Sequence, residues 1–175
     1  MGFGAEDFDS SMMHFNRALA AIDPAVDRNE AAYVYCLIGR RHRFMFEGTK
    51  DTAWWYKAFP WYYKARELTD LADDANALFY TSIVKTFFRV NTPENLDSAY
   101  MYLQKAIKEA DGWNVKTSPK YQFYRLLGRT SELRGDYKKP LPGTTKPWKR
   151  SEKDSLLFSI SEYRDPIRLM MINIC

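Results

Sequence analysis

Few residues in this chain have the types and spacing that catalysis requires. The only histidines are His14 and His42, and no HExxH, GxSxG or Walker glycine motif occurs. Ser82 and Lys85 have the Ser-x-x-Lys spacing of some acyl enzymes, but the motifs that accompany that pair elsewhere are missing. We therefore expect a protein that is not an enzyme and that uses neither a metal nor a cofactor.

Paired cationic side chains are more informative. Lys85 and Arg89 are four residues apart, as are Arg125 and Arg129, so each pair would share one face of a helix. Like charges placed in this way repel each other unless an anionic ligand or a facing carboxylate offsets the repulsion. The two interpretations are an anion-binding surface and a solvated helix face with acidic neighbours.

Helices must position these side chains, because no stretch of the sequence shows the clean alternation of apolar and polar residues that indicates a β-strand. Capping residues, prolines and glycines delimit about seven of them. The first follows a cap at Asp9 or Ser10 and ends near Ile22. The second spans about residues 29–46 and is closed by Gly48, the third follows Asp51 and spans 52–68, and the fifth begins at Thr92-Pro93 and spans 93–110. The others span about 73–89, 119–135 and 151–163. Pro60 leaves two alternatives for the third helix, which either kinks at Pro60 or begins there.

One spacing recurs along the chain: a small residue, a bulky residue four positions later, and alanine three positions after that. It occurs as Ser11/Phe15/Ala18, Ala58/Tyr62/Ala65 and Ala99/Leu103/Ala106. These offsets place the three side chains on one helical face, where the small residues allow a neighbouring helix to approach closely. The first members lie 47 and then 41 residues apart. Such a period predicts a solenoid of antiparallel helix pairs.

The pattern resembles tetratricopeptide (TPR) repeats in a degenerate form with longer repeats. In that family, an aromatic residue followed by Leu-Gly marks helix A, and Ala-x3-Phe-x2-Ala marks helix B. The clearest matches are Tyr124-x2-Leu127-Gly128 followed by Gly135-Asp136-Tyr137, and the pair Ile38-Gly39. The likeness covers roughly residues 8–137. It implies an all-α, TPR-like α-solenoid, whose concave groove is lined by the A helices.

The resemblance also implies which residues face that groove. The matched positions are Tyr33, Cys36, Arg40, Arg43, Thr81, Lys85, Phe88, Arg89, Gln122, Arg125, Arg129 and Glu132, of which six are cationic. The ligand-binding residues would then be Tyr33, Arg40, Arg43, Lys85, Arg89, Arg125 and Arg129. They would bind a peptide or protein segment, most readily an acidic one, through charge-assisted hydrogen bonds.

A dense run of aromatic residues between Trp54 and Tyr63 exceeds what one buried stripe needs. Most of these rings could fill the space opened by the longer repeat. The alternative is that Trp54, Trp55 and Trp61 form a second surface, for a partner or for a homodimer.

The repeat domain would span residues 1–137, followed by a basic linker, 138–150, that contains prolines. A C-terminal helix and apolar tail, 151–175, could cap the stack. Residues 138–153 hold six cations and one acid, so the net charge of +4 is concentrated there. This segment could bind nucleic acid or an anionic surface, although it lacks the interleaved aromatic residues that stack on bases. A solvated linker is the interpretation that we favour.

The length, the apolar content and the cysteines of the chain limit the remaining classes of protein. The 175 residues correspond to one domain, and no run of about 18 apolar residues could span a membrane. Cys36 and Cys175 form no CxxC motif, and the acidic N-terminus lacks the apolar segment of a secretory signal, although a removed signal would leave the same appearance. We expect a cytoplasmic adaptor that binds an acidic protein or peptide. The alternative is a protein that binds nucleic acid or an anionic surface through the same groove and residues 138–153.

Overall fold

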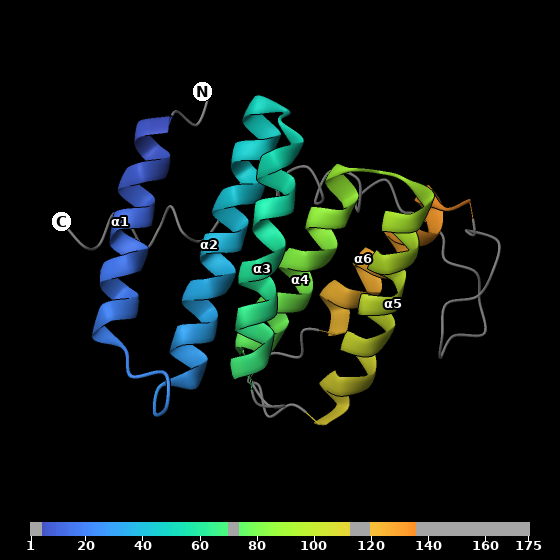
Figure 1. The fold of residues 1–175 in the computed structure, drawn as a ribbon. Helices are drawn as coiled ribbons and strands as arrows, with labels where there is room; N and C mark the ends of the chain where they lie inside the picture. The colour runs from blue at the N-terminus through green and yellow to red at the C-terminus, as the bar shows by residue number, and fades with distance from the viewer. Residues whose placement is uncertain (1–4, 70–73, 113–119, 136–175) are drawn as a thin grey trace. The chain divides into compact units, whose positions relative to one another are not determined.

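Short-range signals in the sequence divide the chain into helices that pack against their neighbours. The computed structural model describes residues 5–69, 74–112 and 120–135, which all belong to one unit, residues 1–136. These ranges contain six α-helices and one 3-10 turn (Figure 1). They are α1 (Ala5–Ala21), α2 (Arg28–Thr49), α3 (Thr52–Leu68), α4 (Asp74–Arg89), α5 (Pro93–Glu109), η1 (Ala110–Gly112) and α6 (Lys120–Leu133). The all-α prediction is confirmed for this part of the chain. The expected linker at 138–150 and the helix and tail at 151–175 lie outside it.

The start of α3 decides between the two alternatives that Pro60 left open. The Asp51 side chain accepts a hydrogen bond of 2.9 Å from the backbone N–H of Ala53, which caps the helix just before Thr52. Pro60 lies inside α3 on an exposed face, where its ring points away from the core. A helix that begins at Pro60 is therefore wrong, and α3 runs through the proline.

The ends of α1 and α2 differ from the expected ones. Asp9 and Ser10 do not cap α1, because the helix already begins at Ala5 and includes both residues. At its C-terminal end, α2 continues past Gly48 to Thr49. Lys50 then takes the left-handed conformation, with φ of 61°, and donates its backbone N–H to the Phe46 carbonyl at 2.8 Å. The turn that ends α2 thus uses lysine where the sequence suggested glycine.

Successive helices pack antiparallel. In addition, α2 contacts α4, and α4 contacts α6, so three helices that are not consecutive lie side by side (Figure 1). α3 packs on α2 and α4, α5 packs on α4 and α6, and α1 packs on α2. These pairings establish six helices with antiparallel neighbours, and the solenoid itself stays a prediction.

The recurring small–bulky–small faces form much of the core. All three residues on α3, Ala58, Tyr62 and Ala65, are fully buried, and so are Ala99, Leu103 and Ala106 on α5. Their counterparts on α1 are only half-buried. The spacing therefore marks a contact face on α3 and α5, and a less enclosed one on α1.

The closest approach of α2 and α3 occurs at Gly39. A Cβ atom on this residue would lie 2.4 Å from Cε1 of Tyr62, a distance at which something must shift. The Tyr62 ring is fully buried, and its hydroxyl is 3.1 Å from the Thr86 hydroxyl on α4. Gly39 thus allows Tyr62 to lie flat against α2 while its hydroxyl reaches α4.

Candidate functional site: an arginine cluster on α2 and α4

Two of the predicted groove residues, Arg43 and Arg89, meet at one carboxylate, and a third, Arg40, lies near Arg43. Oε1 of Glu47 accepts a hydrogen bond of 2.5 Å from Nη1 of Arg43, one turn earlier on α2. The same oxygen accepts a bond of 2.6 Å from Nε of Arg89, which lies 42 residues later on α4. Arg40 lies close enough to Arg43 to affect its charge. We call Arg40, Arg43, Glu47 and Arg89 the arginine cluster.

The members of the arginine cluster differ in their exposure. Arg43 is 4% exposed, whereas Glu47 and Arg89 are 27% and 31% exposed. Burial lowers the pKa of the Arg43 guanidinium, Glu47 raises it, and the nearby Arg89 and Arg40 lower it further. Nε of Arg43 is buried and has no hydrogen-bond partner in the described structure. The predicted groove residue Arg43 is therefore an internal charge that holds Glu47, and Arg40 and Arg89 are the cluster's solvent-facing cations.

The remaining groove candidates lie elsewhere on α2 and α4, or on α6. Lys85 is half-buried one turn before Arg89 on α4, and Tyr33 is exposed near the start of α2. Arg125 and Arg129 are half-buried on α6, which packs on α4. Arg129 forms an ion pair of 3.3 Å with Glu132, three residues later. The structure thus brings Arg43 and Arg89 together at Glu47, with Arg40 near Arg43, and leaves the α6 pair as a second cationic position.

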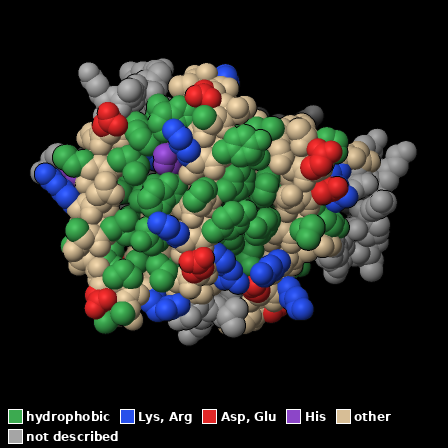
Figure 2. Space-filling model, viewed as in Figure 1, with side chains coloured by type: hydrophobic (Ala, Val, Ile, Leu, Met, Phe, Trp, Pro, Cys, Tyr) green, Lys and Arg blue, Asp and Glu red, His purple; other side chains and the backbone are tan. Residues whose placement is uncertain are grey.

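The tryptophans proposed for a second surface separate into two groups. Trp55 is buried, and its indole N–H donates a hydrogen bond of 2.8 Å to the Thr86 carbonyl, so it belongs to the core instead. Trp54 and Trp61 are half-buried on another side of α3. Figure 2 shows hydrophobic side chains gathered over α2 and α3, with Lys or Arg side chains between them.

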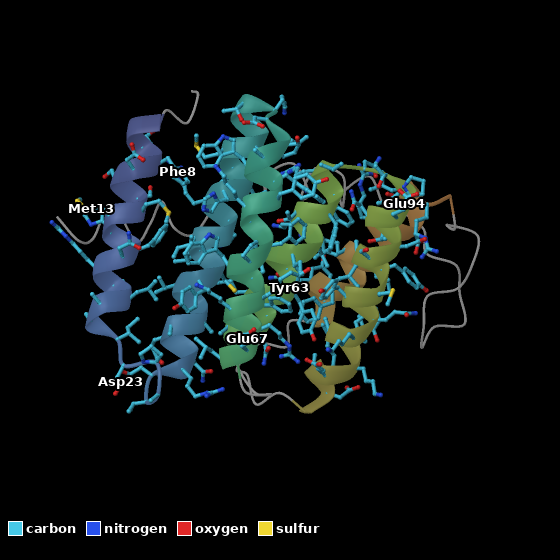
Figure 3. All side chains as sticks on the ribbon, viewed as in Figure 1. Phe8, Met13, Asp23, Tyr63, Glu67 and Glu94 are labelled. Carbon is cyan, nitrogen blue, oxygen red and sulfur yellow. The ribbon has the colours of Figure 1, made fainter. Side chains whose placement is uncertain are left out.

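Trp54 and Trp61 enclose His42 of α2. The ring centroids of Trp54 and Trp61 lie 5.6 and 6.3 Å from that of His42. Phe8, on the side of α1 that faces α2 (Figure 3), lies 5.2 Å from it. Tyr35 stacks on Trp61 with centroids 5.9 Å apart. Because these rings pack against one another, a nucleic-acid base could stack between them only if they moved apart.

His42 is held in its neutral form by this environment. Burial lowers its pKa from 6.5 to about 4, and the nearby Lys57 ammonium adds to the effect. Its Nδ1 atom is buried, without a hydrogen-bond partner among the described residues. Lys57 and Lys64 lie over Trp54 and Trp61, 4.5 and 5.0 Å from the ring centroids. This arrangement suits a packed aromatic cluster with a cationic rim. His42 does not change its protonation state near neutral pH.

A second polar cluster joins α3, α4 and α5. Nη2 of Arg66 donates to Glu109 at 3.1 Å, and the Tyr80 hydroxyl donates to the same carboxylate at 2.8 Å. Nη1 of Arg66 donates to the fully buried Asn76 at 2.7 Å. These bonds link residues of three neighbouring helices, so we interpret this cluster as structural.

Sequence reasoning missed Glu47 as a functional residue. Its spacing of four from Arg43 is the usual spacing of a helical ion pair and could have been noticed. The bond from Glu47 to Arg89 depends on the packing of α2 against α4, which no local pattern encodes.

The part of the chain that the structure describes contains neither a metal-binding cluster nor a membrane-spanning helix, and no family model matches the sequence. Among the residues that the structure describes, no group of three or more His, Cys, Asp or Glu side chains could hold a metal ion. None of the described helices has the length and apolar character needed to cross a bilayer. Searches against models of protein families, curated proteins and solved structures found no match. The function must therefore be inferred from the chain's own side chains.

Proposed function

We propose that the chain is a non-enzymatic, TPR-like adaptor that binds an acidic peptide or protein segment on the α2–α4 face. The observation that carries the proposal is the arginine cluster, in which two guanidinium groups from two helices share the Glu47 carboxylate and a third, that of Arg40, lies near Arg43. Arg40 and Arg89 reach solvent and would contact the ligand first. Lys85, one turn before Arg89, extends the cationic face along α4.

Charge-assisted hydrogen bonds would supply the affinity. Each bond from a guanidinium to a carboxylate is worth about 1.5–3 kcal/mol in a partly buried site. Two such bonds, from Arg40 and Arg89, would account for roughly a hundredfold or more in affinity. A longer ligand would also reach Arg125 and Arg129, because α6 packs on α4.

Fluorescence anisotropy tests this proposal. The probe is a short labelled peptide rich in Asp and Glu, and the control peptide carries Asn and Gln in their place. We expect wild type to bind the acidic peptide only, and the Arg40→Glu/Arg89→Glu variant to lose about a hundredfold or more in affinity. Lys108→Glu reverses an exposed charge on α5, which packs on α4 and α6, and serves as the matched control. Equal weakening in both variants would show a general charge effect and refute the site.

A second candidate function rests on the six cations of residues 138–153, which lie outside the described ranges. Nucleic acid bound by this segment would be released steeply as salt rises, because binding displaces condensed counterions. Peptide bound at the arginine cluster would respond less, since part of that site is buried. Titrations of a single-stranded oligonucleotide and of the acidic peptide over a series of salt concentrations separate the two functions.

A further inference from the structure

The arginine cluster has the geometry of an anion site that already contains an anion. Both short hydrogen bonds end on a single oxygen, Oε1 of Glu47, and they come from donors on different helices. Their lengths of 2.5 and 2.6 Å are shorter than the roughly 2.7–2.9 Å usual between a guanidinium nitrogen and a carboxylate oxygen. The cluster thus binds a carboxylate oxygen between two guanidinium groups.

We propose that Glu47 occupies an oxyanion site formed by Arg43 and Arg89, and that a carboxylate of an acidic ligand can take its place. The inference rests on the proposed function, and it names the chemistry that the ligand must bring. An Asp or Glu side chain or a free C-terminus would meet this requirement, and an amide would not.

Arg43 makes a carboxylate obligatory at this position. Its side chain, on α2, is almost completely buried, so the guanidinium group cannot rotate into water. A buried guanidinium that loses its partner is strongly destabilising, because an uncompensated charge remains inside the protein. Any group that displaces Glu47 must therefore carry the negative charge itself, which selects for acidic ligands.

Glu47 is the member of the site that can leave. It lies in the last turn of α2, two residues before the helix ends at Thr49, and more than a quarter of its side chain is exposed. Rotation about its side-chain bonds would move the carboxylate into water and open its place between Arg43 and Arg89. Glu47 would then act as an intramolecular competitor that lowers the affinity for weak ligands.

Removal of Glu47 tests the exchange directly. In chloride we expect Glu47→Ala to melt below wild type, because Arg43 has lost its partner. When acetate replaces chloride at constant ionic strength, the Tm of this variant should rise with acetate concentration and saturate, since acetate binds the folded state. Glu67→Ala removes an exposed acid from α3 and should respond to acetate no more than wild type. The Glu47→Ala/Arg89→Ala variant should lose the response.

The acidic peptide gives the second measurement. Without its competitor, Glu47→Ala should bind the labelled peptide about tenfold more tightly than wild type, as expected when roughly 1.4 kcal/mol of competition is removed. If Glu47→Ala does not fold, Glu47→Gln fills the same space with a neutral amide, which an anion should displace more easily than it displaces the Glu47 carboxylate, and allows the same titration. An acetate response that persists without Arg89, or the absence of any acetate response in Glu47→Ala, would overturn the exchange.

Failure of the exchange can be told apart from failure of the adaptor function. If Arg40→Glu/Arg89→Glu abolishes peptide binding but Glu47→Ala ignores acetate, the adaptor function stands and the exchange is wrong. If acetate stabilises Glu47→Ala but wild type binds no acidic peptide, the anion site is supported and the peptide's use of it is refuted.

Discussion

A methyl group at Gly39 should be among the most damaging small changes in this fold. The new Cβ would lie 2.4, 2.7 and 2.9 Å from Cε1, Cδ1 and Cζ of the Tyr62 ring. Overpacking of this kind costs about 1–3 kcal/mol. If the ring moves, its bond to the Thr86 hydroxyl is lost inside the core, which costs about 1–3 kcal/mol more. Alanine regains about 1 kcal/mol through its higher helix propensity. We therefore expect Gly39→Ala to lower the free energy of unfolding by about 3 kcal/mol.

Thermal and urea denaturation would measure this loss, which corresponds to a fall in Tm of about 10 °C. Gly48→Ala is the matched control in the same helix, because a Cβ there meets nothing within 4 Å, and it should leave stability unchanged or slightly raised. The Gly39→Ala/Tyr62→Leu variant should lose less than the sum of its single changes, since leucine lacks the ring that clashes. If Gly39→Ala proves as stable as wild type, the close approach of α2 and α3 is wrong.

Three further predictions follow from buried groups. His42 has its pKa held at about 4 when folded, against 6.5 when unfolded, so the unfolded chain binds more protons between these values, and stability decreases as the pH is lowered from 6.5 to about 4, by up to roughly 3 kcal/mol. Thermal melts should show a weaker loss in this window for His42→Phe. Glu109→Gln should cost about 2 kcal/mol in urea denaturation, because Arg66 keeps its charge and loses its carboxylate. In a Cys175→Ser variant, the buried Cys36 thiol, with its pKa raised to about 12, should react with a disulfide reagent only as fast as the protein unfolds.

Helix positions were predictable because the signals that set them act over a few residues. Asp51 and Thr92 cap the helices that follow them, and Pro93 lies in the first turn of α5, as expected. The same kind of reasoning failed at the end of α2, where Gly48 is a suitable residue for a helix end but Lys50 takes the left-handed conformation. Local propensity ranks the candidates for such a position, and the path of the following loop chooses between them.

The candidate site was less predictable because exposure depends on how each helix is rotated. Trp54 and Trp55 are adjacent in sequence, yet one contacts His42 and the other donates to the Thr86 carbonyl on α4. A step of one residue turns a side chain by about 100° around the helix, so a list of aromatic residues does not say which of them face a partner. Arg43 is a similar case, since the groove prediction named it as a ligand-facing residue and could not foresee its burial.

The central claim is that an acidic ligand binds at the arginine cluster, and NMR of the arginine Nε–H groups tests it most directly. The Arg89 signal, assigned by its loss in Arg89→Lys, should shift in a saturable manner when the acidic peptide is added. It should not move with the Asn/Gln peptide. If the acidic peptide instead shifts only the indole N–H signals of Trp54 and Trp61, or shifts nothing, the ligand does not bind at the arginine cluster and the account is contradicted.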